Sequence, residues 1–97
     1  MGEYEKALEM YTKALKIIEK VYGENHPDTA TSYNNIGCAY YGMGEYEKAL
    51  EMLLKSLSIR KVILGESHPI TIDTCENIGY IYQQLGNEEK AMEYLGK

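Results

Sequence analysis

The chain repeats itself at an interval of 42 residues, and this repeat restricts its possible folds more than any other feature. The stretch Gly-Glu-Tyr-Glu-Lys-Ala-Leu-Glu-Met occupies residues 2–10 and recurs letter for letter at 44–52. The same interval separates the dipeptides His26-Pro27 and His68-Pro69. A period between about 20 and 50 residues is typical of stacked arrays of small structural units. We therefore expect a repeat architecture rather than one closed core.

Within each repeat the apolar residues follow the period of an α-helix. In the first segment they are spaced by three and four residues, at Tyr4, Ala7, Leu8, Tyr11, Leu15 and Ile18. Pro27 and Pro69 favour the first turn of a helix, where a proline loses no hydrogen bond. Gly44 and Gly86 favour helix ends, because glycine readily adopts the left-handed conformation of a C-terminal cap. The sequence predicts an all-α chain of five antiparallel helices, at about residues 3–22, 28–42, 45–63, 70–84 and 87–96.

Composition argues against several classes of function. A formal net charge of −5 argues against a nucleic-acid-binding protein, which normally presents a basic surface. No apolar run approaches the ~18 residues that span a bilayer, and the first residues lack the basic region and apolar stretch of a secretory signal. Two separated cysteines, Cys38 and Cys75, are too few for a disulfide framework. We expect reduced thiols in a cytoplasmic protein that binds neither nucleic acid nor membrane.

The sequence contains no pattern typical of a catalytic or metal site. His26 and His68 occupy equivalent positions before a proline, which indicates turn formation and helix capping, and no converging set of metal ligands accompanies them. Cys38 and a distant histidine do not make a nucleophile pair. We predict no enzyme activity, no cofactor and no metal.

The two later units share a pattern of large, small and glycine positions. The middle unit has it at Tyr33, Ile36, Gly37, Tyr40, Gly44, Tyr46, Ala49 and Leu53. The last unit has it at Cys75, Ile78, Gly79, Tyr82, Gly86, Ala91 and Leu95. This pattern resembles that of the tetratricopeptide repeat. The ordinary repeat has about 34 residues, and this longer form with a Gly-Glu-X-His-Pro turn is similar to the repeats of kinesin light chains.

This resemblance implies a right-handed α-α superhelix, a solenoid that starts on a second helix of a repeat. The implied units are a partial one at about 1–26, a full one at 27–68 and a partial one at 69–97, all in a single domain. It also implies an array that binds a cargo or another protein partner.

In this family the first helices line a concave groove and the second helices form the outer wall. All ten basic residues fall on second helices or at the end of the chain: Lys6, Lys13, Lys16, Lys20, Lys48, Lys55, Arg60, Lys61, Lys90 and Lys97. We therefore expect a basic and acidic outer wall and a polar to acidic groove. The predicted groove residues are Asn34, Asn35, Cys38, Tyr41, Asp73, Glu76, Asn77, Tyr80, Gln83 and Gln84.

The chemistry of these side chains suits a peptide ligand. The amides of Asn35 and Asn77 can donate to and accept from a peptide backbone, and Tyr41 and Tyr80 add aromatic contact area. The alternative is that they are ordinary solvated helix surface. Without a basic residue in the groove, we expect a neutral or basic peptide, held by a non-enzymatic scaffold.

A second function remains open, a structural module that assembles with its own kind. The face that carries Tyr4, Leu8, Tyr11 and Leu15 is predicted to lack a packing partner. Burial of one such side chain is worth about 1.5–3 kcal/mol, so its exposure favours a homo-oligomer through the repeat ends.

Overall fold

The computed structural model describes residues 2–96 and contains five α-helices in that range. They are α1 (Gly2–Tyr22), α2 (Pro27–Gly42), α3 (Tyr46–Leu64), α4 (Pro69–Gln84) and α5 (Glu88–Leu95). Each predicted helix boundary is confirmed to within one residue. Lys97, one of the predicted outer basic residues, lies outside the described residues.

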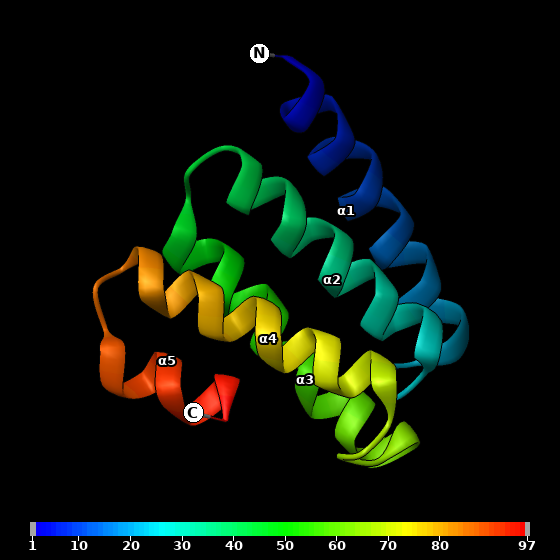
Figure 1. The fold of residues 1–97 in the computed structure, drawn as a ribbon. Coiled ribbons are helices and arrows are strands. Elements are labelled where there is room, and N and C mark those ends of the chain that lie inside the picture. The colour runs from blue at the N-terminus through cyan, green and yellow to red at the C-terminus, as the bar shows by residue number, and fades with distance from the viewer. Residues whose placement is uncertain (1, 97) are drawn as a thin grey trace.

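Consecutive helices pack against each other in a thin, open array. The principal packing pairs are α1 with α2, α2 with α3, α3 with α4, and α4 with α5. Figure 1 shows α2 and α4 side by side with α3 behind them, while α1 and α5 lie at the two ends. The Cα atoms extend over 38 × 35 × 16 Å, and the short dimension fits two layers of helices. The fold is the predicted all-α repeat.

The turn before each first helix is built by a histidine and a proline. Nδ1 of His26 accepts a hydrogen bond from the backbone N–H of Asp28, and Nδ1 of His68 accepts one from Ile70, both at 3.1 Å. Each proline occupies the first turn, where its missing N–H leaves nothing unsatisfied. The predicted capping role of both histidines is confirmed.

Close approach of α2 to α3 depends on a glycine at their crossing. A Cβ atom on Gly37 would lie 3.0 Å from Cγ of Leu53 and 3.2 Å from the backbone oxygen of Ala49. Ala49 and Leu53 are buried there. With Leu57, also of α3, and Ile78 and Ile81 of α4, they form the main apolar core. The absent side chain of Gly37 therefore lets the two helices share this core.

The structure corrects in part the prediction that the face of α1 with Tyr4, Leu8, Tyr11 and Leu15 lacks a packing partner. Leu15 is only 9% exposed, and the ring of Tyr4 lies against Gly42 of α2. Tyr4 and Tyr11 nevertheless remain 49% and 36% exposed, so α2 covers this face only partly. Further exposed apolar side chains of α1 are those of Met10, Ile17 and Val21.

None of the helices within residues 2–96 is both long and apolar enough to cross a membrane.

Candidate functional site

A cleft of about 220 Å³ opens between α2 and α4, above α3. Cys38 and Tyr41 line it from α2, Asn77, Tyr80 and Ile81 line it from α4, and Leu53 of α3 also borders it. Leu53 and Ile81 are each 1% exposed, so apolar carbon forms the deepest part. The structure thus brings four predicted groove residues, Cys38, Tyr41, Asn77 and Tyr80, around one opening.

The two tyrosines are the most accessible part of this cleft. The ring of Tyr41 packs against that of Tyr46 of α3, with centroids 5.4 Å apart and planes tilted by 57°. This contact restrains the Tyr41 ring at the edge of the cleft. The Tyr80 ring faces the cleft from α4 and is about half exposed. Aromatic walls over an apolar base suit an apolar side chain of a ligand.

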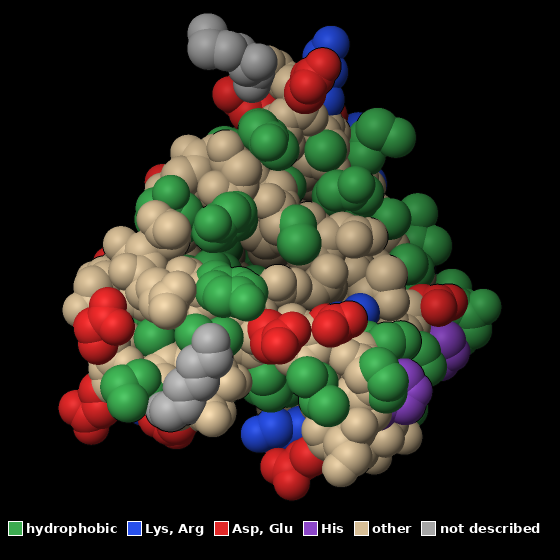
Figure 2. All heavy atoms as spheres, in the orientation of Figure 1, with side chains coloured by type: hydrophobic (Ala, Val, Ile, Leu, Met, Phe, Trp, Pro, Cys, Tyr) green, Lys and Arg blue, Asp and Glu red, His purple; other side chains and the backbone are tan. Residues whose placement is uncertain are grey.

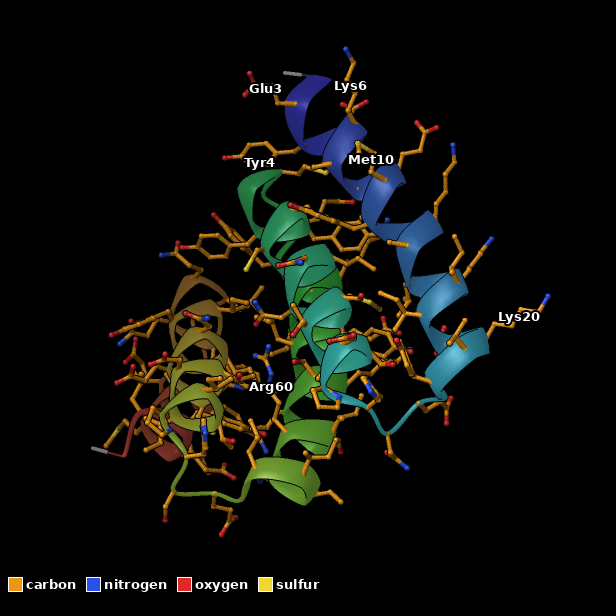
Figure 3. The ribbon with its side chains drawn as sticks, turned by 90° about the vertical axis from the view of Figure 1, so that its right-hand side faces the viewer. Glu3, Tyr4, Lys6, Met10, Lys20 and Arg60 are labelled. Atoms are coloured by element: carbon orange, nitrogen blue, oxygen red, sulfur yellow. The ribbon has the colours of Figure 1, made fainter. Side chains whose placement is uncertain are left out.

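The prediction that every basic side chain lies on the outer wall is wrong for Arg60. Figure 3 shows this side chain between α2 and α4. Its Nη1 donates to Oγ1 of Thr74 at 2.8 Å and to Oδ1 of Asn34 at 3.4 Å, so it contacts both first helices. Leu53 and Arg60 are seven residues apart on α3 and therefore share a face of that helix.

The guanidinium of Arg60 has no carboxylate partner among the described residues. None of the ion pairs within residues 2–96 includes it. Burial lowers its pKa from the ordinary value, and the only charge effect on that pKa comes from Cys38. The groove therefore contains a half-buried cation, and its remaining N–H groups can donate hydrogen bonds to an anionic ligand group.

The neighbouring asparagines Asn34 and Asn35 have different surroundings. Oδ1 of Asn34 accepts from Arg60, which links α2 to α3. Its Nδ2 lies 3.8 Å from Sγ of Cys38, one turn further along α2. Asn35 lies on the other side of α2, in a depression that it shares with Tyr11 and Ala39. These three residues are the repeat equivalents of Asn77, Leu53 and Ile81, 42 positions earlier. The same cleft thus recurs in the first unit, where α1 and α2 border it.

The amides of Asn35 and Asn77 make no side-chain hydrogen bond within the described part of the chain. Since each amide can both donate and accept, both are available to a ligand backbone. Asn77 belongs to the cleft that has two first-helix walls, so it is the better placed of the two.

The four remaining predicted residues are exposed on α4 and line no described cavity: Asp73, Glu76, Gln83 and Gln84. Figure 2 shows acidic side chains over α4 beside a small basic patch. The carboxylates of Asp73 and Glu76 therefore lie outside the cleft.

The thiols of this region are poor nucleophiles. Burial raises the pKa of Cys38 above its ordinary value of 9.0, although Arg60 opposes the shift, and burial also raises the pKa of Cys75. Both remain protonated near pH 7, and the thiolate is the reactive form. Within residues 2–96, no three histidine, cysteine or acidic side chains are grouped as a metal site would require.

Arg60 is a groove residue that the sequence pattern did not predict. Its repeat equivalent in the first unit is Ile18, an apolar residue on the inner side of α1. A basic residue at a position where the repeat otherwise has isoleucine was the available signal.

Comparison with known proteins finds a matching family and similar solved structures. The model of the Tetratricopeptide repeat family matches residues 1–61 and again residues 43–97. The crystal structure of BtubC (BKLC) from P. vanneervenii is similar with a TM-score of 0.88 and 29% identity, over 96% of this chain and 37% of that one. A putative kinesin light chain of Podosopora anserina with nearly identical TPR-like repeats has a TM-score of 0.85 and 25% identity, over 98% and 45%. This chain therefore spans less than half the length of either protein. No curated protein matches it.

Proposed function

The chain belongs to the tetratricopeptide-repeat family, and we propose that its α2–α4 groove binds an extended segment of another protein. Proteins of this family generally act as interaction scaffolds rather than enzymes. The observation that carries the proposal is the combination within one groove of an apolar cleft, the amide of Asn77 and the guanidinium of Arg60. Within residues 2–96 this amide makes no side-chain hydrogen bond and this guanidinium has no carboxylate partner. We also propose a cytoplasmic location, where thiols such as those of Cys38 and Cys75 stay reduced.

The groove residues define the chemistry of the ligand. An apolar side chain fills the cleft between Tyr41 and Tyr80, while the amide of Asn77 pairs with the ligand backbone. Seven helical residues separate Leu53 from Arg60, about 10 Å along α3, which an extended chain covers in about three residues. The ligand therefore carries a carboxylate about three positions from its apolar anchor.

The rest of the ligand is neutral or basic, because Asp73 and Glu76 line the approach. The prediction of a neutral to basic partner assumed a groove without cations, and Arg60 changes that assumption at one point. We thus propose a segment that is neutral overall, with a single acidic side chain opposite Arg60.

An immobilised library of short peptides tests this proposal. The library varies the apolar residue, the carboxylate and the distance between them, and is probed with the wild type, Asn77→Ala and Arg60→Met at two salt concentrations. We expect Asn77→Ala to weaken binding by about 1 kcal/mol. Arg60→Met should abolish both the preference for a carboxylate and its sensitivity to salt. Val62→Ala, on the exposed outer side of α3, is the matched control. Binding that ignores both groove substitutions would refute the groove as the working surface.

The predicted alternative is a structural module that assembles with its own kind. Measurements on variants of the groove and of α1 distinguish it from the proposed groove function. Self-association measured by sedimentation velocity should respond to substitutions on α1 and not to Asn77→Ala if that alternative holds.

A further inference from the structure

The groove between α2 and α4 contains a second, smaller cleft on the other side of Arg60. Its volume is about 110 Å³, and it lies at the end of the groove where both first helices begin (Figure 1). Its aliphatic walls come from three helices: Ala30 of α2, Ile59, Ile63 and Leu64 of α3, and Ile70 of α4. Ala30 and Ile59 are buried and form its base, whereas Ile63 and Ile70 are partly exposed. We call it the aliphatic cleft, and the cleft with Tyr41 and Tyr80 the aromatic cleft.

The two clefts and Arg60 follow one another along the same face of α4. Ile70 lines the aliphatic cleft, Thr74 accepts the hydrogen bond from Arg60, and Asn77 lines the aromatic cleft. Because these residues are spaced by four and three positions, their side chains share one face of the helix. The corresponding residues of α2 are Thr31, Asn34 and Cys38. The guanidinium of Arg60 therefore lies between two apolar clefts in one groove.

Ile70 departs from the pattern that favours a helix start. Its repeat equivalent, 42 positions earlier, is Asp28 in the first turn of α2. The helix dipole stabilises an acidic residue at this position, yet the first turn of α4 has none. The side chain of Ile70 is 43% exposed, so burial in the core does not account for the isoleucine. Sequences break such local rules mainly at functional positions.

Arg60 departs from the repeat at the same place. Its equivalent in the first unit is Ile18, so a cation replaces an apolar residue just where an apolar residue replaces an acidic one. Both departures border the aliphatic cleft. The end of the groove is thereby apolar and basic, without the carboxylate that the first unit has there.

The volumes of the two clefts determine the size of the side chains that they can hold. An apolar cavity of about 150 Å³ holds one benzene molecule. The aromatic cleft, with about 220 Å³, therefore has room for an aromatic ring. The aliphatic cleft, with about 110 Å³, has room for a branched aliphatic side chain and not for a ring.

We infer that the aliphatic cleft binds a second apolar residue of the ligand segment, so that one carboxylate of the ligand lies between two apolar anchors. This inference rests on the proposed groove function and specifies its ligand further. From Arg60 to Leu64 is about 6 Å along α3, which an extended chain covers in about two residues. The ligand therefore has a large apolar residue, a carboxylate about three positions away, and an aliphatic residue about two positions beyond that. A basic residue at the central position is disfavoured by the guanidinium.

Synthetic peptides of defined sequence test this inference. Their core is Phe-Ser-Ser-Glu-Ser-Leu or the reverse order, Leu-Ser-Glu-Ser-Ser-Phe, with both ends blocked and fluorescein attached through a flexible linker. In each order the leucine is also replaced by serine or by phenylalanine. Fluorescence anisotropy measures binding to the whole chain. We expect the leucine peptide of one order to bind at least about fivefold more tightly than its serine and phenylalanine forms.

Variants of the cleft walls locate the effect. Ile70→Ser should bring the leucine and serine peptides to within about twofold of each other and keep the preference for glutamate over glutamine. Ile63→Ser changes the same cleft from α3 and should act alike, which separates the cleft from an effect on the start of α4. Ile72→Ser is the matched control, since Ile72 is 44% exposed on the same helix and is absent from the described walls of both clefts. Circular dichroism checks that each variant is folded.

The outcomes separate this inference from the proposed function. If the wild type does not distinguish leucine from serine while Asn77→Ala and Arg60→Met still weaken binding, the second anchor is wrong and the groove function stands. A leucine preference that persists in both Ile70→Ser and Ile63→Ser also overturns the second anchor. If no peptide binds, both proposals fail. Self-association of the chain that Ile70→Ser abolishes, and that the peptides do not inhibit, would make a second copy the occupant and overturn the inference.

Discussion

Arg60 donates a hydrogen bond from Nη1 to Oγ1 of Thr74 at 2.8 Å, which ties α3 to α4 within the groove. The same Thr74 hydroxyl donates to the backbone carbonyl of Ile70 at 2.9 Å. Thr74 therefore keeps one partner when the guanidinium is removed. Oδ1 of Asn34 loses its longer bond of 3.4 Å, but Asn34 is only half-buried, so water can replace the guanidinium there. Loss of this cation should therefore affect the fold less than ligand recognition.

Arg60→Met should accordingly change ligand preference and leave the fold intact. Methionine retains much of the side-chain volume and removes the desolvated charge. We expect the free energy of unfolding to change by less than about 1 kcal/mol. Urea unfolding followed by circular dichroism at 222 nm measures it. A loss of more than about 2 kcal/mol would show instead that Arg60 is mainly a structural residue.

Gly37→Leu should destabilise the chain. Its side chain would enter the space held by Leu53 and the backbone of Ala49, which cannot move away without parting α2 from α3. Overpacking of this kind costs about 1–3 kcal/mol. The midpoint of urea unfolding is the measurement, and Ser58→Leu on the exposed side of α3 is the control. An unchanged midpoint would mean that the crossing is looser than the structure shows.

His68→Ala and His68→Asn should have different effects. His68 caps α4 through Nδ1, which accepts from the backbone N–H of Ile70. Alanine removes the acceptor and should cost about 1 kcal/mol, whereas the asparagine side chain can replace it. The midpoints of thermal unfolding of the two variants and the wild type measure these losses. Equal losses in both variants would assign the histidine a role in packing rather than in capping.

Alkaline pH should weaken the contact between Tyr33 and Glu19. Burial raises the pKa of Tyr33 from 10.0 to about 12, and the hydrogen bond to Glu19 and the negative charges of Glu19 and Glu24 act in the same direction. The neutral phenol is thus favoured in the folded state. Its contribution to stability is complete below pH 10.0 and is lost as the pH rises toward about 12.

Tyr33→Phe should lose less stability over this interval than the wild type does. Urea unfolding of both proteins at several pH values measures the difference. Tyr80→Phe, which removes an exposed hydroxyl, should follow the wild type. Parallel curves for the wild type and Tyr33→Phe would contradict the proposed coupling.

Local signals in the sequence predicted the helices, because each depends on a few neighbouring residues. Pro27, Pro69 and the histidines before them mark helix starts, and Gly44 marks an end, with a backbone φ of +79° that favours glycine. The interval of 42 residues predicted stacking, and the predicted close approach at Gly37 is confirmed. Four groove residues that the structure brings together were predicted from their place on the first helices.

Only the tertiary structure decided where Arg60 lies and which apolar side chains of α1 stay exposed. Helical periodicity assigns a residue to a side of its own helix, but not to the neighbour that covers that side. Arg60 belongs to a second helix and still reaches the groove, because α3 packs against both α2 and α4. Ile17 of α1 and its repeat equivalent Ile59 of α3 are 64% and 7% exposed, because burial depends on the neighbouring helix and not on the residue alone. The sequence by itself therefore determined the elements and their repeat, and packing between elements decided which surfaces remain free to bind.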